Sequence, residues 1–182
     1  MRKADPLGLC EQVQDRLAQL HEFYDDAWAA FNGDQHAAAR QSTLGELVFH
    51  RAYVELESFL SAYFVACINR NAGTFVDSRR SQIEASVRAK YPGTTVDYVA
   101  FEPPNHLTVA AVGGLVDGNE QNLTFGSYAQ MVDRAQQWLA PEWAAKIVAV
   151  PVSRQRVVDA AKAIRNCIAH QSKASFDSMN AT

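Results

Sequence analysis

The stretch LESFLSAYFVAC, residues 56–67, has the clearest periodicity in the chain. Its apolar side chains recur at steps of three and four residues, which is the spacing of one helical face. We expect this helix to begin near Thr43, because Thr43 and Glu46 have the spacing of a capping box. It should run to about Asn71, long enough to be the central element of a helical bundle. The residues that carry the pattern are Leu56, Phe59, Leu60, Tyr63, Phe64 and Cys67.

Helical periodicity also flanks this central segment on both sides. Each predicted helix is bounded by residues that favour helix starts or stops, mainly Ser, Pro, Asn and Gly. We expect Pro141 either to begin a fresh turn or to kink the helix that contains it. Ser153 can cap the last helix, and the polar tail after it should fray. The further predicted helices are 5–31, 78–91, 127–149 and 153–170.

Residues 92–126 are rich in Gly and Pro and break the helical pattern. They are compatible with a long loop, a short hairpin or a Gly-interrupted helix around 107–115. Gly113 and Gly114 belong to no phosphate-binding motif, because neither GxGxxG nor GxxxxGK[ST] is present. The prediction is therefore an all-α antiparallel helical bundle of about five helices with an irregular Gly/Pro-rich insertion. At 182 residues, 1–182 should form a single domain.

The composition is that of an ordinary globular protein, with 48% hydrophobic and 20% charged residues. A net charge of −3 argues against a protein that coats nucleic acid through a broad basic surface. Cys10, Cys67 and Cys167 show no metal-ligand spacing and are expected to be buried, reduced thiols. The longest apolar run is too short for a membrane span, and no secretory signal is visible. We expect a cytoplasmic protein with no membrane association, no metal and no cofactor.

The last predicted helix carries an unusual set of polar side chains. Val157, Ala161, Ile164 and Ile168 form the expected core stripe, with Arg165 at its edge. Asn166 and His170 are four residues apart and are neighbours on the opposite face. On an ideal helix, Arg165 and His170 lie about 140° apart. If they act together, either the helix loosens after Arg165 or a second copy of the chain supplies part of the site.

The same region is locally basic. Between Lys146 and Lys173 there are six cations and one carboxylate, a net charge of +5. Such a stripe suits a phosphodiester substrate. Cations also collect at helix carboxyl ends for electrostatic reasons, but this explains only the later ones. The candidate RNA-binding residues are Arg154, Arg156, Lys162 and Lys173.

The segment RNCIAH, residues 165–170, resembles the R-x4-6-H signature of the HEPN superfamily in its Arg-Asn-xxx-His form. The sequence of the predicted helix around Glu57, Phe59 and Leu60 is similar to that of the RiboL-PSP-like branch. The resemblance covers about 43–172. It implies a helical bundle that dimerises with its motifs facing, and in many members a metal-independent endoribonuclease. Such members include toxins of toxin–antitoxin pairs and antiviral-defence effectors, so an antitoxin or defence-system protein is an expected partner.

Carried onto this chain, the resemblance makes Arg165 and His170 the catalytic pair and Asn166 their polar companion. An imidazole can exchange a proton near neutral pH, and a guanidinium can hold two phosphate oxygens. Glu57 either orients Arg165 or is a plain carboxylate at the edge of the stripe. The expected reaction is attack by the ribose 2′-hydroxyl, giving a 2′,3′-cyclic phosphate. Two alternatives remain open: a non-catalytic module that binds RNA, a nucleotide or a protein, and a structural dimerisation domain.

Overall fold

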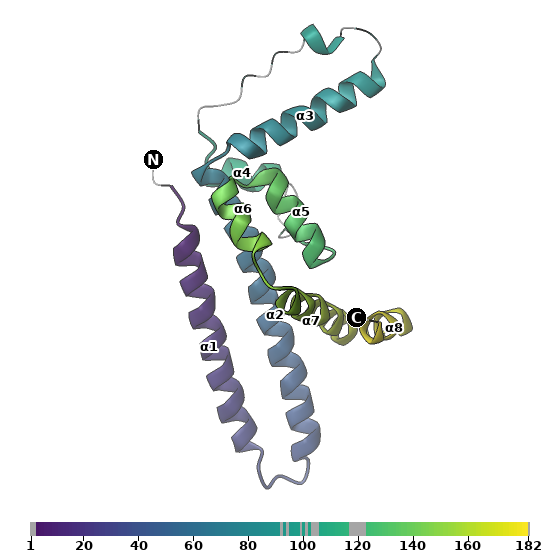
Figure 1. Ribbon diagram of the computed structural model, residues 1–182. Helices are drawn as coiled ribbons and strands as arrows, with labels where there is room; N and C mark the ends of the chain where they lie inside the picture. Colours follow the sequence, from purple (N-terminus) through teal and green to yellow (C-terminus); the bar gives the residue numbers. More distant parts are fainter. Residues whose placement is uncertain are drawn as a thin grey trace. The chain divides into compact units, whose positions relative to one another are not determined.

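The computed structural model describes residues 3–91, 93, 95–98, 100, 102, 106–116 and 123–181. These residues form eight α-helices and one short 3₁₀ helix, with no strand among them (Figure 1). The prediction of an all-helical chain is confirmed for this part. The helices are α1 (Pro6–Ala30), α2 (Ala37–Arg70), α3 (Gly73–Lys90), η1 (Thr95–Tyr98), α4 (Val109–Val116), α5 (Tyr128–Trp138), α6 (Pro141–Val148), α7 (Val152–His170) and α8 (Lys173–Asn180).

The predicted number of about five helices is wrong, for three local reasons. The Gly-rich stretch 109–116 is helical in spite of Gly113 and Gly114, and forms α4. Pro141 occupies the first turn of a separate helix, α6, where its missing N–H costs no hydrogen bond. The tail predicted to fray forms α8, which is started by a capping box between Ser172 and Ser175.

Three predicted helix starts are also wrong. The helix predicted over 78–91 is α3, which begins five residues earlier, at Gly73. The first turn of α2 closes six residues before Thr43, because the Asp34 carboxylate accepts the His36 N–H at 2.7 Å and the Asp34 carbonyl accepts the Ala37 N–H at 3.0 Å. Thr43 lies inside α2, and its hydroxyl donates back to the Ala39 carbonyl. In α7, Pro151 is the N-cap and Ser153 lies within the first turn.

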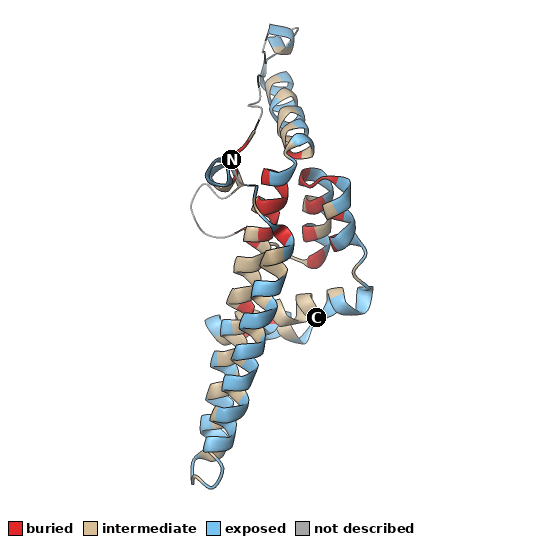
Figure 2. Cartoon of the chain, turned by 90° about the vertical axis from the view of Figure 1, so that its left-hand side faces the viewer, coloured by how far each residue is buried: buried red, intermediate tan, exposed pale blue. Residues whose placement is uncertain are grey.

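The chain divides into two compact units, and α2 contributes to both. One unit comprises Met1–Pro6, Tyr63–Gln121 and Ala129–Ala149. Its buried residues gather on the carboxyl-terminal part of α2 and on α5 and α6 (Figure 2). The Phe75 and Trp138 rings meet edge to face at 5.4 Å. Asn69 is buried but satisfied, because its side chain donates to the Leu107 carbonyl at 2.7 Å and accepts the Ala4 N–H at 2.9 Å.

The second unit comprises Leu7–Ala62, Asn122–Tyr128 and Val150–Thr182. Its α1 and the first part of α2 form an antiparallel hairpin, which turns at Gly33 with a positive φ of 86°. The hairpin is fastened by Arg16, whose guanidinium contacts Glu55 at 3.2 Å. Tyr53, Ala163 and Cys167 are among the few buried residues here, so α2 and α7 supply much of the core of this unit.

The three cysteines are free thiols, as expected from their spacing. Cys67 and Cys167 are buried, whereas Cys10 is only half-buried. None of the helices in the described part of the chain combines the length and the apolar character that crossing a bilayer requires.

Candidate functional site

The helix α7 carries the sequence-predicted site residues and is regular to its last turn. It ends at His170, where Gln171 adopts the left-handed conformation with φ 45° and its N–H donates to the Cys167 carbonyl at 2.9 Å. The helix therefore does not loosen after Arg165. With ideal geometry, Arg165 and His170 are separated by about 140° of rotation and about 7.5 Å of rise. Within one chain, the two side chains leave the helix in different directions.

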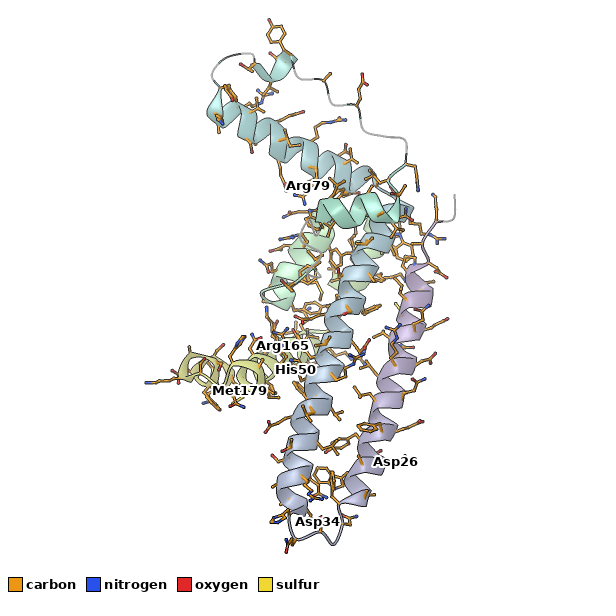
Figure 3. The ribbon with its side chains drawn as sticks, turned by 180° about the vertical axis from the view of Figure 1, so that it is seen from behind. Asp26, Asp34, His50, Arg79, Arg165 and Met179 are labelled. Atoms are coloured by element: carbon orange, nitrogen blue, oxygen red, sulfur yellow. The ribbon has the colours of Figure 1, made fainter. Side chains whose placement is uncertain are left out.

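Arg165 is held in place by three neighbours. Its Nη2 donates to the Glu57 carboxylate on α2 at 2.8 Å, and its Nη1 donates to the Asn166 side-chain oxygen at 2.9 Å. Its guanidinium carbon lies 5.5 Å from the centroid of the Tyr53 ring, which is within the range of a cation–π contact. The Glu57 and Arg165 side chains are 17% and 25% exposed, so this ion pair is partly shielded from water. Figure 3 shows Arg165 where α7 meets α2.

The guanidinium keeps unused donors. A guanidinium has five N–H groups, and only two of those on Arg165 have acceptors among the described residues. The Nε–H is buried and has no acceptor in the part of the chain that the structure describes. Each terminal nitrogen retains a second N–H, and guanidinium N–H groups pair well with phosphate or carboxylate oxygens.

Tyr53 is the buried aromatic beneath this cluster, at 8% exposure. Burial raises the pKa of its phenol to about 12, and the nearby negative charges of Glu57 and Asp159 act in the same direction against the opposing effect of Arg165. Asp159 is one turn of α7 before Ala163 and accepts the Tyr128 N–H at 2.7 Å. The phenol is consequently neutral throughout the physiological pH range.

Asn166 and His170 differ in their surroundings. Asn166 is half-buried and oriented by its contact with Arg165. His170 is exposed and forms no hydrogen bond or ion pair with any residue that the structure describes. The imidazole is thus accessible to a ligand, while the guanidinium is fixed.

The cations predicted to form one basic stripe do not all lie on one face of α7: on an ideal helix Arg154 lies about 20° from Arg165, but Arg156 does not share that side. Lys162 is half-buried, and its ammonium group donates to the Phe125 carbonyl. Arg154, Arg156 and Lys173 are exposed, and Arg156 lies about 180° from Arg165 on an ideal helix. Lys146 belongs to the other compact unit, where it lies 5.9 Å from the Trp143 ring centroid. Among the α7 cations, Arg156 therefore lies away from the side of the helix that carries Arg165.

The predicted core stripe of α7 is wrong in the described chain. Val157 and Ile164 are 66% and 36% exposed, whereas Ala163 and Cys167 are the buried residues of this helix. The small Ala163 and Cys167 side chains allow a close approach of α7 to its neighbours, whereas on an ideal helix Arg165 lies about 160° from both of them. Of the predicted stripe, Val157 and Ile164 are exposed, and Ala161 and Ile168 are half-buried.

Sequence reasoning missed Tyr53, which lies four residues before Glu57 on the same face of α2 and could have been found from that spacing. His50 is half-buried on the same face of α2 as Glu57. Across the residues described, no three His, Cys, Asp or Glu side chains are grouped as a metal site would require.

No model of a known protein family matches the chain, and no curated protein or solved structure was found to be similar to it.

Proposed function

We propose that this chain is a metal-independent endoribonuclease of HEPN type that works as a homodimer. The observation that carries the proposal is the environment of Arg165. Its guanidinium is oriented by Glu57 at 2.8 Å and by Asn166 at 2.9 Å, yet each terminal nitrogen keeps an N–H for a ligand. An arginine prepared in this way supports stabilisation of a phosphorane-like transition state, where negative charge builds up on the phosphate oxygens.

The dimer is proposed because one chain does not bring the guanidinium and the imidazole together. The helix stays regular between Arg165 and His170. In the proposed site, Arg165 of one copy therefore acts with His170 of the other. The exposed stripe containing Val157 and Ile164 offers an apolar surface along α7 for a second copy. A two-fold axis beside this stripe would set the two α7 helices side by side, with Arg165 of each copy at the edge of the interface.

In the proposed reaction, His170 takes the proton of the ribose 2′-hydroxyl, which attacks the adjacent phosphorus. Arg165 stabilises the added charge, and a protonated imidazole, from the second copy of His170, returns a proton to the departing 5′ oxygen. The products are a 2′,3′-cyclic phosphate and a 5′-hydroxyl. Arg154 and Lys173 are exposed cations that can contact flanking phosphates, and this contribution should weaken as salt rises.

The test is to incubate the purified full chain with RNA in EDTA and to analyse the product ends. Cleavage should proceed and give cyclic phosphates, while the same sequence made of DNA stays intact because it lacks the nucleophile. Arg165→Ala and His170→Ala should each abolish cleavage. His21→Ala is the matched control, because His21 is an exposed histidine on α1. Cleavage that persists in both variants would place the activity elsewhere.

A second candidate function is a non-catalytic module that binds RNA or a protein partner, such as an antitoxin or a defence-system protein. It is favoured by the divergence of Arg165 and His170 along a regular α7. In that case RNA should bind without being cut during long incubation. Arg165→Ala should then weaken binding, and His170→Ala should have little effect.

A further inference from the structure

The guanidinium of Arg165 is restrained at its edges by hydrogen bonds and at one face by a ring. Glu57 and Asn166 each accept one N–H, and both lie beside the terminal nitrogens. The Nε end is different, because its N–H is buried and donates to no described group. Contacts in the guanidinium plane therefore leave the group free to tilt out of that plane.

The Tyr53 ring is the contact that opposes this tilt. Its centroid lies 5.5 Å from the guanidinium carbon, and the residue is almost fully buried at 8% exposure. Tyr53 and Glu57 are four residues apart on α2, so they present one continuous surface to Arg165. A buried aromatic has few accessible orientations, which makes it a firm support for a planar cation.

We propose that Tyr53 is a positioning residue that acts through its ring, holding the Arg165 guanidinium so that its unused N–H groups face a bound phosphodiester. This inference rests on the proposed ribonuclease function for the identity of the ligand, but the positioning of Arg165 can be measured without it. The hydroxyl group has no part in the role. A buried phenol beside a guanidinium and a carboxylate resembles an acid–base catalyst, so the two roles have to be separated.

The environment of the phenol argues against proton transfer. Burial, together with Glu57 and Asp159, raises the pKa of Tyr53 to about 12. A group with that pKa is a poor proton donor near neutral pH, where general acid catalysis works best with a pKa close to the operating pH. The ring, in contrast, contributes at any pH at which Arg165 is charged.

The experiment compares Tyr53→Phe, which keeps the ring, with Tyr53→Leu, which removes it, in the full chain. The first readout is the ¹⁵N–¹H resonance of Arg165 Nε, identified by its loss in Arg165→Lys. The second is RNA cleavage in EDTA. Tyr53→Phe should keep the resonance near its original position and cleave within about twofold of the parent. Tyr53→Leu should shift or broaden the resonance and reduce cleavage about tenfold, a factor in the range of one cation–π contact.

Phe31→Leu is the matched control, because Arg40 lies over the Phe31 ring at 6.0 Å, and the Arg165 resonance should not respond to this change. If Tyr53→Leu does not fold, as judged by circular dichroism, Tyr53→Met supplies a bulkier non-aromatic side chain with the same expectation.

Equal loss of cleavage in Tyr53→Phe and Tyr53→Leu would assign the role to the hydroxyl and overturn the proposal. An Arg165 resonance unchanged by loss of the ring would overturn it as well. If the parent chain cuts no RNA, the ribonuclease proposal fails, and the Arg165 resonance alone decides whether Tyr53 positions the guanidinium.

Discussion

Breaking the ion pair between Glu57 and Arg165 should have a measurable and predictable cost. The two side chains meet at 2.8 Å and are 17% and 25% exposed. A charge-assisted hydrogen bond contributes about 1.5–3 kcal/mol, against about 0.5–1.5 kcal/mol for a neutral one. Glu57→Gln keeps an acceptor but loses the charge, so it should destabilise the chain by about 1 kcal/mol. Glu57→Ala also removes the acceptor and should cost about 2 kcal/mol.

The clean measurement is a double-mutant cycle with Glu57→Gln and Arg165→Met, using urea unfolding followed by circular dichroism. We expect a coupling free energy of about 1 kcal/mol. The control cycle uses Asp34 and Arg40, which meet at a similar 2.9 Å but are 29% and 52% exposed. Because surface pairs contribute little, the control coupling should be smaller, about 0.5 kcal/mol or less. A Glu57–Arg165 coupling no larger than that of the control would refute the idea that shielding from water strengthens this pair.

Three further predictions follow from burial and charge. Val157→Glu should change the free energy of unfolding by less than about 0.5 kcal/mol, because Val157 is 66% exposed. The same substitution should convert the proposed dimer to a monomer in sedimentation. Val152→Glu is the control, because Val152 is 62% exposed on another face of α7, and this variant should leave the dimer intact. Phe64→Ala should destabilise the chain by about 3–5 kcal/mol in urea unfolding, because Phe64 is fully buried and truncation leaves a cavity. The parent chain should lose stability between about pH 10 and 12, since the unfolded phenol of Tyr53 gives up its proton near 10 while the folded one holds it to about 12. Tyr53→Phe should lose less stability over this range in unfolding experiments at each pH, the remainder coming from Tyr128, whose pKa is also raised by burial.

The helical character of the chain could be predicted from short-range patterns. In 56–67, apolar residues at steps of three and four mark a helix whatever lies around it, and α2 does continue through this stretch to Arg70. Helix boundaries were harder to predict from the sequence. Asp34 and Thr43 are both suitable capping residues, and only the closure of the turn after Gly33 determines that Asp34 starts α2.

The candidate site also has one feature that the sequence predicts and one that it does not. The spacing from Arg165 to His170 fixes their separation on a regular helix, and this part needed no tertiary structure. Which face of α7 is buried could not be predicted, because the helix has an apolar stripe at Val157 and Ile164 and a second face of small residues at Ala163 and Cys167. Periodicity measures how residues are distributed around one helix, whereas burial depends on what the neighbouring helix presents.

Only the tertiary structure brought Tyr53 and Glu57 of α2 against Arg165 of α7, and Glu57 is 108 residues from Arg165 in the sequence. Local sequence determines which residues share a helical face, because backbone hydrogen bonds fix the rise and rotation per residue. Which faces of two helices pack together depends on side chains that are far apart in the sequence. The free energy of that packing is a small difference between the loss of conformational entropy and the gain from burial, which nearly cancel. For this protein, the sequence determined the helices and the content of the motif, and the packing of α7 on α2 decided which of its groups are held and which are left free.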